Sequence, residues 1–131
     1  MKIFDEFDEL RAELQQRWID YYEDNRDWIK SLGLDKGDSW SVTVDNQTQT
    51  RYCPDHRFIV GVASLLDERV VDYIRIGIRM SAQDSYTVVV KGLGLRFDPE
   101  VAIKQREEAA KMQEAKLLSA SDDNSDDPTE E

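Results

Sequence analysis

The 131-residue chain has little of what marks several large classes of protein. It contains one cysteine, so it cannot form an internal disulfide, and cysteine usage gives no support to an oxidising compartment. It has no run of about 18 apolar residues, which argues against a membrane span. Asp5 and Glu6 stand near the start of the chain, where a secretory signal would need its apolar stretch. We therefore expect a cytoplasmic protein with no membrane partner.

Basic residues are also outnumbered, with 17 Lys and Arg against 28 Asp and Glu, for a net charge of −11. Residues 117–131 hold six acidic residues and no basic one, which is more than half of this excess. Binding to a phosphate backbone needs clustered Lys and Arg, so we expect no nucleic acid as a partner. Length and apolar content suit one core. We expect one globular domain over residues 1–118 and a disordered acidic tail over 119–131.

The spacing of apolar residues predicts helices first and a small sheet after them. Residues 4–24 follow the helical period, and a short helical segment continues past Asn25 to Gly33, so two helices or one bent helix both fit. Residues 39–44 alternate between polar and apolar, which predicts a strand that turns at 45–47 and returns over 48–53. A compact helix over 56–66 is expected to follow, with Asp55 as its N-cap.

Residues 69–80 fit two structures, and residues 86–90 are rich in β-branched residues. In a helix, Asp72, Arg75 and Arg79 form one polar stripe, whereas in a strand apolar and polar residues alternate over 73–80. We favour a β-hairpin with a turn at 81–85, because Gly77 weakens a helix by about 1 kcal/mol and β-branched residues favour strands. A last helix is expected from about 99 to 118. The expected class is α+β, with helices packed around a small antiparallel β-sheet.

No chemical motif in the chain is complete. Cys53 and His56 lie close in sequence, but a thiol nucleophile also needs a group to orient its base, and zinc needs about four ligands. Gly92 and Gly94 lack the third glycine of a dinucleotide-binding loop, because Phe97 stands in its place. The carboxylates of the first helix are typical of a solvated face. We expect no enzyme, no metal and no cofactor.

Aromatic and basic residues are the features that most suggest a binding surface. Four aromatic residues lie within residues 18–28 and a fifth, Trp40, lies on the predicted sheet. Core packing explains most of them, yet Tyr and Trp also dominate binding hot spots. The arginines in the middle of the chain fit either carboxylate recognition or internal ion pairs. The candidate peptide-binding residues are Trp18, Tyr21, Tyr22, Trp28, Trp40, Arg75 and Arg79.

Three blocks of the chain resemble a small cyanobacterial family of domains without an assigned function. They are residues 17–29 (RWIDYYEDNRDWI), 58–66 (FIVGVASLL) and 93–99 (LGLRFDP). The resemblance covers most of residues 4–102. Members of that family are typically plain helical domains, whereas residues 40–44 and 74–90 here look more like strands. That departure indicates a specialised branch.

The branch that the chain resembles contains carboxysome assembly chaperones. This resemblance implies a non-enzymatic cytosolic protein that binds the C-terminal tail of a carboxysome shell hexamer protein and assists shell assembly around Rubisco. It supplies no binding residues. We expect a monomer that takes an extended peptide either at a sheet edge or through apolar anchors in a groove, with Arg75 or Arg79 receiving an acidic group. The alternative is a regulatory protein-binding module of another cyanobacterial, photosynthetic complex.

Overall fold

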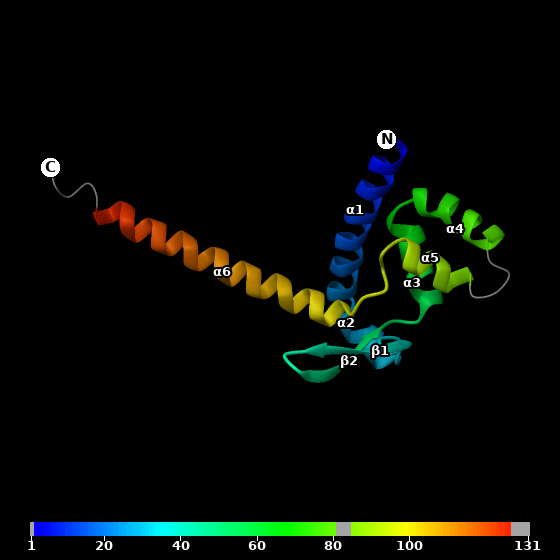
Figure 1. Cartoon of the computed structure of the whole chain (residues 1–131), viewed down its shortest axis with the longest axis horizontal. Coiled ribbons are helices and arrows are strands. Elements are labelled where there is room, and N and C mark those ends of the chain that lie inside the picture. The colour runs from blue at the N-terminus through cyan, green and yellow to red at the C-terminus, as the bar shows by residue number, and fades with distance from the viewer. Residues whose placement is uncertain (1, 81–84, 127–131) are drawn as a thin grey trace. The chain divides into compact units, whose positions relative to one another are not determined.

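A computed structural model of the chain describes residues 2–80 and 85–126 (Figure 1). The chain divides into two compact units, residues 1–99 and 100–131. The elements in chain order are α1 (Lys2–Asp24), α2 (Arg26–Ser31), β1 (Asp38–Val44), β2 (Gln47–Cys53), α3 (His56–Leu66), α4 (Arg69–Met80), α5 (Ser85–Gly92) and α6 (Pro99–Asp126). The expected α+β class, with helices and a small antiparallel sheet, is confirmed.

The first two helices form where the apolar period predicted them. Leu10, Leu14 and Trp18 lie on one face of α1 and are buried. Asn25 separates α1 from α2, and its side-chain amide donates to a backbone carbonyl of α1 at 2.9 Å, so there are two helices rather than one bent helix. Gly33 follows α2 with φ of 73°, as expected for the left-handed residue past a helix end.

The two strands form an antiparallel hairpin, as the alternation of residues predicted. Asp45 and Asn46 at its tip have φ values of 52° and 64°, which is the left-handed pair of a type I′ turn. This turn fixes the register of the strands, in which Ser41 lies opposite Thr50. Figure 1 shows the hairpin below α1, α3, α4 and α5.

Helix α3 is the centre of the helical body, because it contacts α1, α4 and α5. The carboxylate of Asp55 accepts the backbone N–H of Arg57 at 2.8 Å, which confirms the expected N-cap. Ile59 and Ala63 on this helix are fully buried. The core around them includes side chains from the other helices: Leu14, Trp18, Val70, Val89 and Val90.

The β-hairpin expected over residues 69–90 is wrong, because the chain forms the helices α4 and α5 there. Helix α4 turns Val70, Tyr73 and Ile74, which follow helical spacing, toward the core. The consecutive valines of α5 contribute two more buried side chains. Strand propensity spans only about 1 kcal/mol, and burial of one face of each helix outweighs it here.

Helix α6 is longer than expected, since it runs to Asp126 instead of ending at about 118. No proline or glycine interrupts the sequence over 100–126. Residues 119–126 of the acidic tail expected over 119–131 are part of α6. The rest of that tail, 127–131, and residues 81–84 of the expected turn lie outside the described residues. Within the described ranges, no helix has the length and apolar character needed to cross a bilayer.

Candidate functional site

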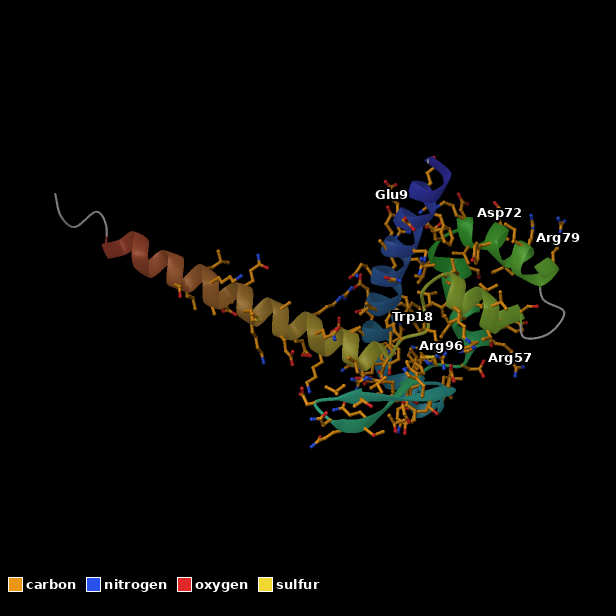
Figure 2. All side chains as sticks on the ribbon, viewed as in Figure 1. Glu9, Trp18, Arg57, Asp72, Arg79 and Arg96 are labelled. Atoms are coloured by element: carbon orange, nitrogen blue, oxygen red, sulfur yellow. The ribbon has the colours of Figure 1, made fainter. Side chains whose placement is uncertain are left out.

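Four polar side chains, which we call the Asp38 network (Asp38, His56, Thr87 and Arg96), join the base of the hairpin to the helices. Oδ2 of Asp38 accepts hydrogen bonds from Nε of Arg96 at 2.8 Å and from Nε2 of His56 at 2.9 Å. The other imidazole nitrogen, Nδ1, lies 2.8 Å from the hydroxyl oxygen of Thr87. A carboxylate only accepts hydrogen bonds, so Nε2 carries the proton that it donates to Asp38. Figure 2 shows Arg96 beside the hairpin.

The network holds Asp38 charged and leaves its neighbour Cys53 neutral. Partial burial acts to raise the pKa of Asp38, but hydrogen bonds from Arg96 and His56 bring it below its ordinary value of 3.8. Cys53 is fully buried, with Sγ 4.0 Å from Oδ2 of Asp38. Burial, reinforced by that nearby carboxylate, raises the pKa of Cys53 to about 12. The thiol is therefore protonated at neutral pH and is a poor nucleophile.

Asp38, Cys53 and His56 each offer one atom of a type that binds metals, all within 4.8 Å of one another. One feature argues against a metal centre. Arg96 already occupies the carboxylate oxygen at 2.8 Å, and its positive charge repels a cation. The arrangement favours a structural network over a metal site.

Thr87, His56 and Asp38 also follow the order of a hydroxyl–imidazole–carboxylate relay. In such a relay the carboxylate stabilises the imidazolium that forms when the base takes a proton. Here Arg96 shares the same carboxylate oxygen and offsets its charge, which weakens that stabilisation. These contacts suit side chains that hold the hairpin to α3 and α5.

Sequence reasoning did not single out Asp38, Thr87 and Arg96. The three hydrogen bonds of the network span 18, 31 and 58 residues, so no local pattern connects their members. The only local signal was the closeness of Cys53 to His56. The structure explains that closeness by a shared neighbour, since both side chains meet the Asp38 carboxylate.

The predicted aromatic residues do not gather in one groove. Trp18 and Tyr22 are fully buried in the core, and Tyr21 stacks on Trp18 with ring centroids 6.3 Å apart. Trp28 on α2 is 40% exposed and packs edge-on against Phe58 of α3. The rings of Trp18, Tyr21 and Tyr22 therefore pack within the domain, and Trp28 retains an accessible face.

The other three predicted residues lie in two further places. Trp40 is half-buried on β1, with the guanidinium carbon of Arg96 4.4 Å from its ring centre, in a cation–π contact. Arg75 and Arg79 are exposed on α4. Figure 2 shows Arg79 and Asp72 along α4, away from Arg96. Figure 2 also shows Trp18 away from Arg79, so these two predicted residues do not share a site.

Internal ion pairs account for part of the arginine cluster. Arg69 pairs with Asp67 at 2.7 Å and with Glu13 of α1 at 3.2 Å. Hydrogen bonds from Arg69 lower the pKa of Asp67 below its ordinary value of 3.8, against the opposing effect of burial. Arg75 lies 3.7 Å from Asp72, one turn earlier on the same helix. Internal pairing, one of the two roles expected for the arginines, is confirmed for Arg69 and Arg75.

The outer edge of β1 carries backbone groups that no other described segment binds. The N–H of Tyr52 donates to the Asp98 carboxylate at 2.9 Å and so points away from β1. Ser39 and Tyr52 therefore form a non-hydrogen-bonded pair of the hairpin. Because hydrogen-bonded and non-hydrogen-bonded pairs alternate along a hairpin, Ser41 and Thr43 also belong to non-hydrogen-bonded pairs. These three β1 residues are exposed and direct their N–H and C=O groups outward. No backbone hydrogen bond from another part of the described chain reaches them.

This edge of β1 lacks the features that usually protect a sheet edge. Residues 38–44 contain no lysine, proline or glycine. Their exposed face carries small hydroxyl side chains, and the opposite face carries the half-buried Trp40 and Val42. On β2, by contrast, the Asp98 carboxylate already occupies the outward N–H of Tyr52. Of the two edges, β1 is the one open along its length.

Residues 1–125 match a family of unknown function (DUF5331), and the chain belongs to that family. The match includes the first unit and nearly all of α6. No curated protein and no solved structure matches the chain. The resemblance to a family of domains without an assigned function is confirmed at this level.

Proposed function

We propose that the protein is a non-enzymatic adaptor that binds an extended peptide by strand addition to β1. The open edge at Ser39, Ser41 and Thr43 is the observation that carries this proposal. An added strand would pair its backbone with these residues, which provides affinity. Every second side chain of the peptide would lie beside Trp40 and Val42, which provides specificity.

The partner we propose is the C-terminal tail of a carboxysome shell hexamer protein. This part of the proposal rests on the resemblance of residues 17–29, 58–66 and 93–99 to a small cyanobacterial family, and on the branch of that family that the chain is taken to resemble, the carboxysome assembly chaperone CcmS. A C-terminal extension has one free end, so it can lie extended along an open edge without threading through a loop. The protein would act as a monomer in the cytoplasm, at the assembling carboxysome shell.

The Asp38 network supports a binding role over a catalytic one. Arg96 offsets the charge of the carboxylate that a general-base relay needs, and the buried thiol of Cys53 is protonated. The network instead fixes the first residue of β1 to α3 and α5. A fixed edge loses little entropy on binding, so most of the ordering cost falls on the peptide. We expect a Kd of about 1 μM, because the tail becomes ordered when it binds.

Calorimetric titration with a synthetic C-terminal tail of the shell protein tests this proposal. Ser41→Pro removes one outward N–H but no bond of the β1–β2 ladder, and it should weaken binding by about tenfold. Thr50→Pro is the matched control, because Thr50 lies opposite Ser41 and its N–H points outward from β2. Circular dichroism checks that both variants fold.

The control should keep the affinity of the original protein. Equal weakening in both proline variants would contradict binding at β1. Absence of saturable binding at millimolar tail would remove the shell protein as the partner, and co-purification with photosystem components would favour the regulatory alternative.

A further inference from the structure

An apolar pocket lies where α3, α4 and α5 meet. Its volume is about 220 Å³, and it is lined by Val60, Ile74, Ser85, Tyr86 and Val89. An apolar cavity of about 150 Å³ accommodates benzene, so this pocket has room for one Leu or Phe side chain. Tyr86 is 50% exposed, so part of the lining is reached from solvent.

The two helices beside the pocket expose further apolar side chains. Ile76 of α4 is 52% exposed, and Val71 of α4 and Val88 of α5 are also exposed. Single exposed apolar residues are ordinary, but several on two adjacent helices that share a pocket are typical of an interaction surface.

The charge of these helices is opposite to that of the chain. Helices α4 and α5 contain four basic residues, Arg69, Arg75, Arg79 and Lys91, and one acidic residue, Asp72, in a protein of net charge −11. The only acidic residue between them in sequence is Asp84, outside the described ranges.

Arg75 and Arg79 are four residues apart and therefore lie on one face of α4. Arg75 forms an ion pair with Asp72 at 3.7 Å, and both side chains are well exposed. Such a pair contributes little to stability, so Arg75 can bind the carboxylate of a ligand instead. Arg79 has no ion pair within the part of the chain that the structure describes. Arginine binds carboxylates through two parallel hydrogen bonds, which makes this face suited to an acidic ligand.

We propose that this α4–α5 surface, defined by Ile74, Arg75, Arg79, Tyr86 and Val89, binds an acidic segment of a partner protein that carries one large apolar side chain. The pocket takes the apolar side chain, and neighbouring carboxylates of the segment meet the two arginines. The pocket has room for one large side chain, so we expect one apolar anchor in the segment. The local positive charge favours acidic residues beside that anchor. The surface shares no residue with the β1 edge, so it is a second binding site beyond the proposed function.

A displayed library of random short peptides, selected against the full-length protein, is the probe for this surface. We expect the selected peptides to carry a Leu, Phe or other large apolar residue flanked by Asp or Glu. Binding of one such synthetic peptide should weaken by about tenfold in Arg79→Glu and in Tyr86→Ser, measured by calorimetry. Both side chains are exposed, so neither variant disturbs the core.

Two variants serve as matched controls and should bind the peptide normally. Lys104→Glu reverses a charge on α6, and Leu65→Ser removes an apolar side chain that is 88% exposed on α3. Ser41→Pro should also bind it normally, which separates failure of this inference from failure of the proposed function.

Three results would overturn the inference. Selection could yield no binding peptide, or peptides that lack acidic residues. The selected peptide could be insensitive to both Arg79→Glu and Tyr86→Ser. Deletion of residues 119–131 could strengthen binding, which would assign the surface to the chain's own acidic tail rather than to a partner.

Discussion

Trp18 shows how an aromatic residue on an amphipathic helix can resemble a binding residue and yet belong to the core. Its ring is fully buried, and its indole N–H has no hydrogen-bond partner within the described chain. An unpaired buried N–H costs about 1–3 kcal/mol, and the burial of the large apolar ring offsets this cost. Trp28 differs, because it is 40% exposed and its indole donates to the Asn25 side chain.

Replacing these two tryptophans separates core packing from surface packing. Trp18→Ala should lower the free energy of unfolding by about 3–5 kcal/mol, because it leaves a large cavity. Trp28→Ala should lower it by about 1 kcal/mol, since part of the ring already contacts water. Urea unfolding followed by far-ultraviolet circular dichroism measures both. Equal losses would mean that the two rings do not differ in burial.

Cys53 provides a second test at the scale of one residue. Its pKa of about 12 leaves roughly 10³-fold less thiolate than an ordinary cysteine has near neutral pH. The native protein should therefore react far more slowly with a thiol-specific chromogenic disulfide at pH 8 than the urea-unfolded protein. Rapid labelling under native conditions would show that the thiol is reachable and ionised.

At the scale of elements, the sequence predicted helices and strands correctly where the spacing of apolar residues follows either the helical or the strand period. The β1–β2 hairpin and α3 follow clear alternation or a clear cap, and both were confirmed. Residues 69–80 fit both the helical and the strand period, and the propensities of residues 69–90 favoured strands. Residues 69–80 and 85–92 form helices because these helices pack against α3. That long-range contact is not visible in the local sequence.

The candidate sites were predictable to different extents. An open sheet edge was one of the two binding modes expected, but the choice between edges depends on Asp98, which lies 46 residues from Tyr52. Arg75 and Arg79 were among the predicted binding residues, whereas the pocket that Ile74 lines depends on the helical form of α4 and α5. The Asp38 network joins four segments and had no local signal.

Arg96→Gln tests whether the Asp38 network holds the hairpin in place. It removes the charged hydrogen bond to Asp38 and the cation over Trp40, and should cost about 1 kcal/mol because the pair is partly exposed. In Arg96→Gln, amide hydrogen exchange should accelerate more in β1 and β2 than in α3, relative to the original protein. Arg75→Gln, which alters an exposed ion pair, is the control and should leave the hairpin unchanged. Equal exchange rates in the hairpin of both variants would refute this role.

At the scale of the whole molecule, two carboxylates connect separate parts of the first unit. Asp38 joins the hairpin to the helices, and Asp67 binds Arg69, which also reaches α1. The pKa of each is lowered in the folded protein, so between the folded and unfolded pKa values the unfolded chain binds more protons. Their contribution to stability is complete above the ordinary value of 3.8 and is lost as the pH falls through the folded values.

Urea unfolding between pH 7 and pH 2 should therefore show stability falling below about pH 4. Asp38→Asn should make this decline shallower, because one of the two linked carboxylates is absent. Glu9→Gln, at an exposed position of α1, is the control and should retain the full decline. An unchanged slope in Asp38→Asn would show that this carboxylate has no part in acid unfolding.

Amide hydrogen exchange of β1, measured by NMR with and without saturating shell-protein tail, tests strand addition most directly. The proposal predicts slower exchange at Ser39, Ser41 and Thr43, whose N–H groups point outward. It predicts little change at Trp40 and Val42, which are already bonded to β2. Such alternating protection would place the peptide on the β1 edge. Saturating tail without slower exchange at the three outward amides would contradict the proposal.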